Sequence, residues 1–552
     1  MIIELASTAL LFLTFIAFAG KRGLTYMHVY QQEEYDTPRL LSWIWKNKAF
    51  DKRLSILILI ACGVYYFAAP LIFDYVAPIF FNFTLLLFMA IATALEKDPR
   101  KDSKKKLVST SRAKRIFIPA YILSILAATW CFLPIIPMPW IWIVNIHLIP
   151  LLLVFVNTAL APFEEINQKK FWNEAHNKVL DLKPTVVGIT GSFGKTSVKH
   201  ILGHILKTQA KTLITPGSVN TSMGIARIVR EELESDHKYL IVEMGAYGHG
   251  SIERLCDLTP PDLGIITAIG HAHYERFKSL EAVAETKYEL AQSVVSRGGQ
   301  MIVHERTLRF EYSRQIRKEH ESQFIVCGDL PDVDKSKQTD KSYLQKGDLE
   351  IQKIIQTAKG LEVRFNWKNV QYNVESPLYG IHHGHNIALA FATAFELGVS
   401  SADIQAALHS LPQIEHRLEV RKQSGGLTII DDAYNSNPMG FQAALGVLSQ
   451  IGNNKRKILI TPGMVELGKI HDEAHKTIGA YAGEVCDIAI IVKGKRIPTF
   501  IKAFKETGGS KQLHEVESFD EAQKWISKNK QDGDVVLIEN DLPDIYERVP
   551  KI

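Results

Sequence analysis

The chain has 552 residues, of which 46% are hydrophobic and 22% charged, and its formal net charge is +5 at pH 7. This length accommodates about three domains. Lysine and arginine number 64 against 59 aspartate and glutamate, so the charge gives no argument for nucleic-acid binding. The five cysteines are scattered without a Cys-x-x-Cys pair, which suggests neither a zinc site nor a disulfide framework and fits a reducing cytoplasm.

The first 162 residues consist of apolar runs separated by basic loops, and they predict a helical transmembrane region of about five spans. A helix needs roughly 17–25 mostly apolar residues to cross a bilayer. The first run lacks a clear small-residue cleavage site after it, so we expect an uncleaved anchor rather than a signal peptide. The runs cover approximately 2–20, 54–75, 78–95, 116–133 and 140–161.

Basic residues are concentrated in two of the loops between these runs. The segment 21–53 holds seven lysines and arginines and 96–115 holds nine, whereas the connections near Ala77 and around 134–139 hold none. The positive-inside rule therefore predicts that both basic loops and everything after about residue 162 are cytoplasmic. We expect a multi-pass protein of the cytoplasmic (inner) membrane, with its remaining domains in the cytoplasm. Besides setting topology, the basic loops could bind anionic lipid or a lipid-linked phosphate.

From Lys183 onward, apolar runs of strand length alternate with helical patterns, which predicts mostly parallel α/β sheets covered by helices. The more polar segment 327–373 predicts a small antiparallel patch. The pattern restarts near residue 412. The expected organisation is a transmembrane region at 1–162, a linker at 163–183, a central α/β domain at 184–412 and a C-terminal Rossmann-like α/β domain at 413–552. The expected strands are 185–189, 239–242, 263–267, 300–303, 427–430, 457–460, 488–492 and 535–538.

The segment 190–197 reads Thr-Gly-Ser-Phe-Gly-Lys-Thr-Ser and lies between an apolar run and a helical pattern. Gly191 and Gly194 allow backbone N–H groups to crowd around phosphate oxygens, and the helix N-terminus adds positive partial charge. Lys195 is predicted to reach the β- and γ-phosphates, and Thr196 to bind Mg²⁺. The loop departs from the strict Walker pattern only at its first position. It predicts a site for ATP and Mg²⁺.

Further motifs follow this loop in order, and together they resemble the Mur ligases, ATP-dependent amide-bond ligases of peptidoglycan precursor synthesis. The resemblance is closest to the branch that adds D-alanyl-D-alanine, and it covers about 184–552. The motifs are Glu-Met-Gly-Ala from Glu243, Ile-Gly-His-Ala-His from Ile269, Ala-x-x-Lys-x-Glu around Lys287, 380–390, 415–419, 431–438 and 463–468 with the nearby His475.

The resemblance implies a role for individual residues of this chain. It implies that Lys195, Lys287, His271 and Arg417 are the catalytic set. The nucleotide would be held by Gly191, Ser192, Gly194, Lys195, Thr196 and Ser197 at the phosphates, Asn386 at adenine, Asp432 at ribose, and Arg417 after closure of the last domain. The Mg²⁺ ligands would be Thr196, Glu243, His271 and Lys287, the last as a carbamylated lysine. The substrates would meet Asn220 and Thr221 on one side and Tyr434, Asn435 and Asn437 on the amine side.

Three departures from the family pattern limit what the resemblance implies. The segment 163–183 is too short for the domain that binds the UDP-sugar in soluble members, and the apolar region occupies its place. His383 replaces the first Asn of the Gly-x-His-Asn-x-x-Asn run. Glu539-Asn540-Asp541 stands where related ligases carry Lys-Gly-Ser, which weakens any inference about the amine substrate.

The expected activity is ATP-dependent joining of a carboxylate to an amine through an acyl phosphate. The expected substrates are a muramoyl-peptide acceptor, UDP-linked or lipid-linked, and D-alanyl-D-alanine. A ligase for a poly-amino acid and a non-catalytic membrane scaffold that binds ATP remain alternatives. The sequence does not decide the oligomeric state or whether Asn145 and His147, at the entry of the last run, are functional or merely hydrated.

Overall fold

The computed structural model describes residues 2–68, 77–101, 103, 106–132, 141–270, 277, 279–330, 348–357, 359–423, 426–434, 436–465 and 467–541. They divide into a helical unit within residues 1–167 and an α/β unit at 168–541. The helical unit contains α1 (Ile2–Gln32), α2 (Thr37–Lys46), α3 (Lys52–Ala68), α4 (Ala77–Leu95), α5 (Ser111–Ala128), η2 (Thr129–Phe132) and the first part of α6 (Ile141–Leu182).

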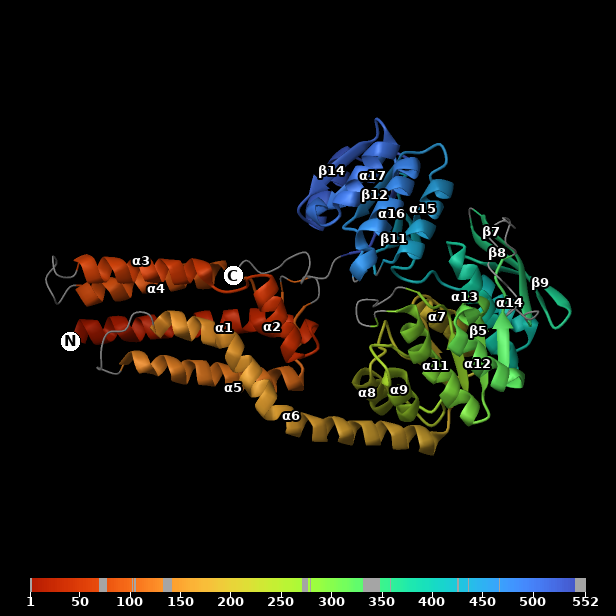
Figure 1. The fold of residues 1–552 in the computed structure, drawn as a ribbon, viewed down its shortest axis with the longest axis horizontal. Helices are drawn as coiled ribbons and strands as arrows, with labels where there is room; N and C mark the ends of the chain where they lie inside the picture. Colours follow the sequence, from red (N-terminus) through yellow and green to blue (C-terminus); the bar gives the residue numbers. More distant parts are fainter. Residues whose placement is uncertain are drawn as a thin grey trace. The chain divides into compact units, whose positions relative to one another are not determined.

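The helices of the first unit match the five apolar runs, but they do not all meet the criteria for membrane spans. Figure 1 shows α1, α3, α4 and α5 as a bundle. Among the described residues, only Leu5–Gln32 and Ile141–Leu182 are both long and apolar enough to cross a membrane, and Ile79–Leu95 is a shorter apolar helix. The expectation of five spans is therefore supported only in part. The predicted linker at 163–183 forms the C-terminal part of α6 up to Leu182, and the connection around 134–139 lies outside the described residues.

Charged side chains lie inside the helical unit and tie its basic loops together. The buried Arg22 guanidinium of α1 bonds the carboxylates of Asp51 at 2.8 Å and Glu96 at 3.0 Å. The side-chain amide of Gln31 donates to the carbonyl of Val108 and accepts from its N–H, both at 2.9 Å. These contacts put the two basic loops at the same end of the unit, as the predicted topology requires.

The two polar residues at the entry of the last apolar run face other helices. His147 Nε2 lies 3.0 Å from Ser55 Oγ on α3. Asn145 is buried, and its Nδ2 has no hydrogen-bond partner within the part of the chain that the structure describes.

The first domain of the α/β unit is one sheet, in which the described strands follow the order β2-β3-β1-β4-β5-β6-β7-β8-β9. Strands β1 to β6 are parallel, β7 pairs with β6 in parallel, and β8 and β9 continue the same sheet as antiparallel partners of β7 and β8. The segment 327–373 thus contributes the antiparallel strands that were expected, as a continuation of the first sheet. The elements are β1 (Thr185–Thr190), α7 (Lys195–Lys207), β2 (Thr212–Ile214), α8 (Ser222–Glu232), β3 (Tyr239–Glu243), α9 (Ser251–Leu258), β4 (Leu263–Ile266), α11 (Leu280–Ser296), β5 (Gln300–His304), η3 (Glu305–Arg309), α12 (Glu311–Glu319), η4 (Glu321–Gln323), β6 (Phe324–Cys327), β7 (Leu349–Thr357), β8 (Gly360–Trp367), β9 (Val370–Ser376), α13 (His382–Glu396) and α14 (Ser401–His409).

Helices cover both faces of this sheet, because the continuous apolar strands have side chains to bury on each side. Val187 and Ile189 of β1 pack with α7, α13 and α14. Val186 packs on the opposite face with α8, α9, α11, α12 and the end of α6. The carboxyl ends of β1, β3, β4 and β5 share one edge, which is where open α/β sheets bind ligands.

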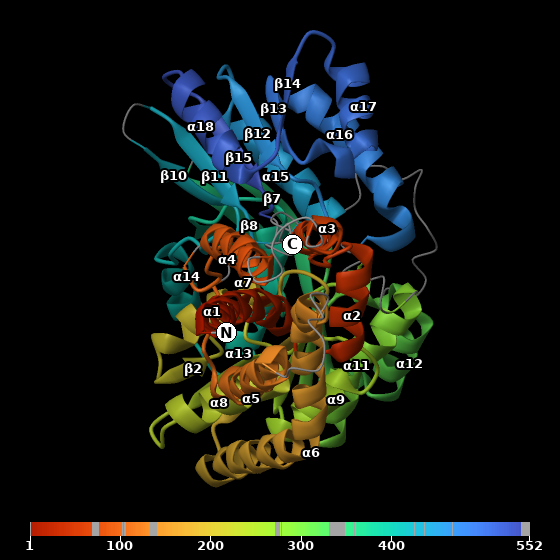
Figure 2. The same cartoon turned by 90° about the vertical axis from the view of Figure 1, so that its left-hand side faces the viewer.

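The second domain has the strand order β10-β11-β15-β12-β13-β14 among the described residues, with only β10 antiparallel. Helices α15, α16 and α17 pack on one face and α18 on the other, as Figure 2 shows. Its elements are β10 (Glu419–Lys422), β11 (Thr428–Asp432), α15 (Pro438–Ile451), β12 (Lys457–Thr461), η6 (Gly468–Ile470), α16 (His471–Val485), β13 (Ile488–Val492), η7 (Gly494–Arg496), α17 (Pro498–Gly508), β14 (Gln512–Val516), α18 (Phe519–Asn529) and β15 (Val535–Glu539).

Candidate active site

The predicted phosphate loop connects β1 to α7, and two of its positions accept only glycine. Gly191 has φ 155° and Gly194 has φ 85°. A Cβ at Gly191 would lie 1.9 Å from Thr267 Oγ1, and one at Gly194 would lie 2.7 Å from Asn386 Oδ1. The Lys195 ammonium folds back and donates to the carbonyl of Gly191 at 2.7 Å. The loop thus has the tight shape and the lysine that a nucleotide phosphate requires.

Two serines support this loop from either end. Ser192 Oγ donates to the Gly270 carbonyl at 3.0 Å and accepts from the Gly270 N–H at 2.9 Å, which ties the loop to the segment after β4. Ser197 is buried in the first turn of α7. In this structure Ser192 therefore fixes the loop's conformation, whereas Ser197 belongs to the buried face of α7.

The two predicted oxygen ligands of Mg²⁺ meet at the carboxyl ends of neighbouring strands. Thr196 Oγ1 donates to Glu243 Oε2 at 3.0 Å, and Glu243 is only 1% exposed. Burial alone would raise the pKa of the Glu243 carboxyl, but the Lys199 and Lys195 ammonium groups hold this pKa below its ordinary value. An ionised carboxylate beside a hydroxyl is a donor set that suits Mg²⁺.

Lys199 is a residue of this site that the sequence analysis missed. Its fully buried ammonium lies 3.0 Å from Glu243 Oε2 and also donates to the carbonyl of Gly217. The sequence signal was its position one helical turn after Lys195, which puts both lysines on the same face of α7.

Lys287 lies on α11 in the same interior. Burial and the nearby Lys195 ammonium lower the pKa of the Lys287 amine well below its ordinary value. Glu289, two residues later, has a structural role. Its carboxylate accepts hydrogen bonds from the N–H groups of Gly250, Ile252 and Glu253 at 2.7–3.1 Å and so caps α9. The predicted ligand His271 lies outside the described residues.

Asn220, expected to contact substrate, is hydrogen-bonded to the metal-site carboxylate. Its Nδ2 donates to Glu243 Oε1 at 3.2 Å, and its Oδ1 accepts from the Tyr247 hydroxyl at 2.8 Å. Thr221 follows at the N-cap of α8, where its side chain makes no capping bond. The loop before α8 therefore adjoins the predicted Mg²⁺ site.

Asn386, expected at adenine, lies in the first turn of α13 against the phosphate loop. Its Oδ1 is the atom nearest the missing Cβ of Gly194. His383, which replaces the first Asn of the family run, is buried, and its Nδ1 lies 3.4 Å from Asn386 Nδ2.

The residues expected at the hinge and at the ribose lie around the end of β11. Arg417 stacks on the Tyr434 ring at 4.4 Å, and its neighbours His416 and Leu418 have φ 56° and 51°, which is strained for non-glycine residues. Asp432 is buried beside Glu539, its register partner on β15, and burial raises the pKa of Asp432 to about 7.

Of the remaining predicted substrate residues, one is exposed to solvent and another has a structural role. Tyr434 is half-exposed, whereas Asn437 Oδ1 accepts the Gly440 N–H at 3.0 Å and caps α15. His475 accepts the N–H of Met464 at 2.9 Å and so supports the nearby loop. Asn435 lies outside the described residues.

The fold and this edge of the sheet define a P-loop α/β enzyme with a second α/β domain. The family description of the Mur ligase middle domain matches residues 189–394. That of the Mur ligase, glutamate ligase domain matches residues 416–539.

Among known proteins, the UDP-N-acetylmuramoyl-tripeptide–D-alanyl-D-alanine ligase of Mycobacterium tuberculosis is 28% identical over 379 residues, which are 64% of this chain and 70% of that protein. The enzyme of the same name from Bacillus subtilis is 28% identical over 362 residues, or 65% and 73% of the two chains.

Two solved structures share the fold of the α/β unit. MurF from Acinetobacter baumannii is 24% identical, with a TM-score of 0.56 over 69% of this chain and 79% of that one. The MurF ligase of Thermotoga maritima, in complex with ADP, is 24% identical, with a TM-score of 0.57 over 69% and 82%.

The two family matches together span more than half of the sequence, and this chain belongs to the Mur ligase family. It is an ATP-dependent ligase of the acid–amino-acid type.

Proposed function

We propose that this chain adds D-alanyl-D-alanine to the free carboxylate of a muramoyl peptide in peptidoglycan synthesis. The observation that carries the proposal is the convergence of Lys195, Thr196, Glu243 and Lys287 at one edge of the first sheet. The names of the matched relatives support the choice of substrates. The division into a central domain at 184–412 and a C-terminal domain at 413–552 belongs to the same proposal.

The residues at this edge suit transfer of a phosphoryl group to a carboxylate. A carboxylate accepts an amine poorly, so its oxygen first attacks the γ-phosphorus of ATP, ADP leaves, and an acyl phosphate remains. The amine then attacks the acyl carbon and phosphate leaves. Lys195 offsets negative charge on the phosphates, and Arg417 would add charge when the last domain closes. Bound Mg²⁺ would neutralise charge on the transferring group, held by Thr196, Glu243, His271 and a carbamylated Lys287.

The environment of Lys287 favours its carbamylation. Carbon dioxide reacts with a neutral amine, and burial keeps the Lys287 amine neutral by lowering its pKa. The carbamate replaces a neutral nitrogen by an anionic oxygen donor, which suits Mg²⁺ better. Mass spectrometry of peptides cannot detect this labile group, so loss of activity in Lys287→Ala and its restoration by short-chain carboxylic acids is the appropriate test.

The helical unit would anchor the enzyme in the cytoplasmic membrane through all five predicted spans. Large apolar side chains are exposed on its helices, among them Phe67 at 84%, Phe80 at 65% and Phe155 at 62%. Soluble monomers rarely expose apolar surface on this scale. Some charged groups of the unit are instead paired in its interior, as with Arg22 and Asp51. Retention of the protein in membranes after an alkaline carbonate wash is expected, and its release would contradict the membrane assignment.

A lipid-linked acceptor is the second candidate, favoured by this same unit. The two family matches begin at residue 189, after the helical unit, and this chain matches only 70% and 73% of the two relatives. If the membrane region holds the acceptor, the muramoyl peptide would be presented on a lipid rather than on UDP. The D-alanyl-D-alanine chemistry is unchanged in either case.

Phosphate release by the full-length protein in detergent tests the proposal. D-alanyl-D-alanine is offered with the UDP-linked tripeptide, then with its lipid-linked counterpart, and the products are weighed by mass spectrometry. A product only with the lipid-linked acceptor assigns acceptor binding to the helical unit. ATP binding without stimulated turnover by either acceptor would support a scaffold, and turnover with another amine or a poly-amino acid would change the substrate.

A further inference from the structure

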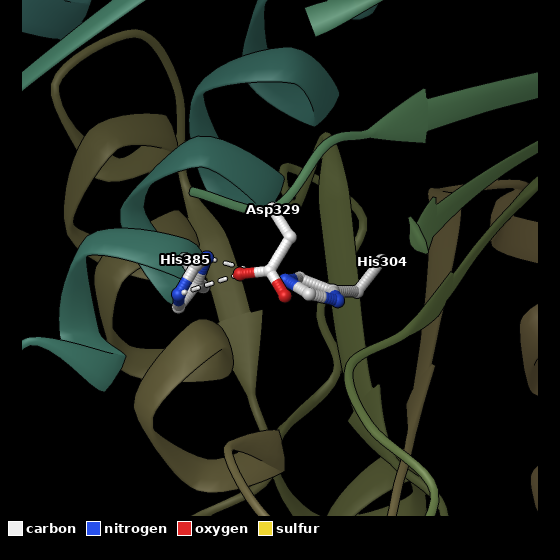
Figure 3. Close-up of side chains that lie close together, drawn as sticks. All are labelled: His304, Asp329 and His385. Atoms are coloured by element: carbon white, nitrogen blue, oxygen red, sulfur yellow. Dashed lines mark hydrogen bonds and ion pairs between the residues drawn. The ribbon is translucent and has the colours of Figure 1, made fainter. Parts of the chain in front are cut away.

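Three side chains outside the predicted catalytic set meet at the same edge of the first sheet (Figure 3). His304 ends β5, Asp329 follows β6 and His385 lies in the first turn of α13. His304 Nε2 lies 3.2 Å from His385 Nδ1, and His385 Nε2 lies 3.4 Å from Asp329 Oδ1. We call these three residues the His304–Asp329 chain.

The hydrogen-bond partners fix where each proton lies. The backbone N–H of Arg306 donates to His304 Nδ1 at 3.1 Å, so the neutral His304 ring carries its proton on Nε2. That proton points to His385 Nδ1, which must accept it. His385 is therefore protonated on Nε2 and donates to Asp329 Oδ1. The other oxygen, Asp329 Oδ2, accepts from the Arg306 guanidinium.

This proton arrangement argues against a metal ion, although two histidines and an aspartate are common metal ligands. Metal ligation through His304 Nε2 would remove the ring's only proton, because Nδ1 already faces an N–H. A metal-bound histidine normally donates its other ring N–H to an acceptor. The Arg306 guanidinium also places a positive charge on the carboxylate that a cation would need.

The His304–Asp329 chain is also unsuited to sense pH near neutrality. Burial and the neighbouring His385 lower the pKa of His304 to about 3, and burial lowers that of His385 to about 4. The positive charge and the hydrogen bond of the Arg306 guanidinium hold the Asp329 pKa below its ordinary value, against the effect of burial. Both rings stay neutral and the carboxylate ionised across the physiological range, so the hydrogen bonds persist.

The His304–Asp329 chain holds the first turn of α13, which has no side-chain cap of its own. Ile381 occupies the N-cap of α13 and makes no side-chain capping bond among the described residues. His385 is joined to β5 and to the end of β6, while the next residue, Asn386, packs on Gly194 of the phosphate loop. A rotation of this turn would move Asn386 away from the loop.

We propose that His385 is a positioning residue for the nucleotide, acting through Asn386, and that His304 and Asp329 hold it in place. The inference rests on the proposed function and on the role that the family resemblance implies for Asn386, contact with the base of ATP. It assigns the three side chains to the binding of ATP rather than to the chemistry on the carboxylate and the amine.

The test measures the affinity of the full-length protein for a non-hydrolysable ATP analogue by calorimetry. His385→Phe keeps the ring and removes both hydrogen bonds, and about a three- to tenfold weaker affinity is expected. His385→Gln, which offers a donor and an acceptor, should retain more of the affinity. In an Asn386→Ala background, His385→Phe should cost nothing further, because its effect passes through Asn386. His409→Phe, an exposed histidine of the same domain, should change nothing.

Steady-state kinetics separate positioning from a general loss of structure. His385→Phe should raise the KM for ATP while kcat and the KM for the amine stay near wild type. Additive losses in the double variant, or equal falls of kcat and of active protein, would overturn the proposal. Stoichiometric Zn²⁺ bound by the wild type and lost in His385→Phe would overturn it in favour of a metal site. If Asn386→Ala alone leaves the affinity unchanged, positioning through Asn386 is refuted, whereas the ligase reaction is judged separately by its product.

Discussion

Replacing Lys199 by methionine tests whether the predicted metal site depends on a buried ion pair. The Lys199 side chain is 0% exposed and that of Glu243 is 2% exposed, with 3.0 Å between Nζ and Oε2. Removing one partner of such a pair costs about 3–5 kcal/mol, because the other charge stays buried. Thr196 and Asn220 still bond Glu243, so the lower end, about 3 kcal/mol, is expected. The carbonyl of Gly217 also loses its donor.

Hydrogen exchange of the full-length protein measures this loss directly. The residues of β3 are buried and the strand pairs on both sides, with β1 and β2, so exchange of its amides reports opening of the domain. A loss of about 3 kcal/mol corresponds to roughly 100-fold faster exchange. Lys207→Met, at the exposed end of the same helix, is the matched control and should leave β3 unchanged.

The double variant Lys199→Met/Glu243→Leu decides the interpretation. If the cost arises from an unpaired buried charge, removing Glu243 as well should restore much of the protection. Equal or greater loss in the double variant would show that packing, and not charge pairing, governs this position. Exchange of β3 at the wild-type rate in Lys199→Met would refute the reasoning altogether.

Three further predictions follow from single contacts. The pKa of Asp432 is raised to about 7 by burial beside Glu539. Its contribution to stability is therefore full below about pH 4 and is lost as pH rises through 7. Calorimetry at pH 5.5 and 8.5 should show a lower midpoint of thermal unfolding of the second domain at pH 8.5, and Glu539→Gln should reduce the difference. Glu289→Ala removes the cap of α9 and should lower stability by about 1–2 kcal/mol in denaturant titrations while ATP affinity is kept; a loss of ATP affinity alone would contradict the capping role. Gly194→Ala should weaken binding of the ATP analogue at least about tenfold, because its Cβ would lie 2.7 Å from Asn386 Oδ1 at φ 85°, whereas Gly298→Ala, also at positive φ but in open space, should not.

The predictable part of the fold is the part that is encoded in local patterns. All eight expected strands are present, because long apolar runs such as 239–242 have no alternative to the interior of a parallel sheet. Two of the strands that were missed are short or polar: β2 has three residues, and β10 reads Glu-Val-Arg-Lys. Their pairing comes from a neighbouring strand in the tertiary structure. The missed β6, in contrast, reads Phe-Ile-Val-Cys and is fully buried. The extension of the first sheet by β7 to β9 depends on a crossover from β6 that no local pattern reveals.

The candidate site was predictable where a motif is contiguous and unpredictable where the contact is between distant segments. The phosphate loop with Lys195 and Thr196 could be read in one stretch. Glu243 needed only the assumption that neighbouring strands end at one edge. The His304–Asp329 chain joins three segments between residues 304 and 385, and nothing in any one of them indicates the other two. Lys199 went unmentioned in the sequence analysis because its burial depends on the tertiary structure.

The replacement of Lys-Gly-Ser at the end of β15 changes the electrostatics of the second domain. Glu539 is fully buried, with Ser436 donating to its Oε1 at 2.6 Å, and burial together with the adjacent Asp432 raises the pKa of its carboxyl well above its ordinary value. Two neighbouring buried carboxyl groups cannot both ionise cheaply, so the Asp432–Glu539 pair keeps a proton. A carboxylate of the amine substrate would find no positive charge at position 539. If the proposed amine substrate is D-alanyl-D-alanine, other groups of the second domain have to bind its carboxylate. Glu539→Lys should then lower the KM for this amine in the phosphate-release assay, and an unchanged KM would contradict the argument.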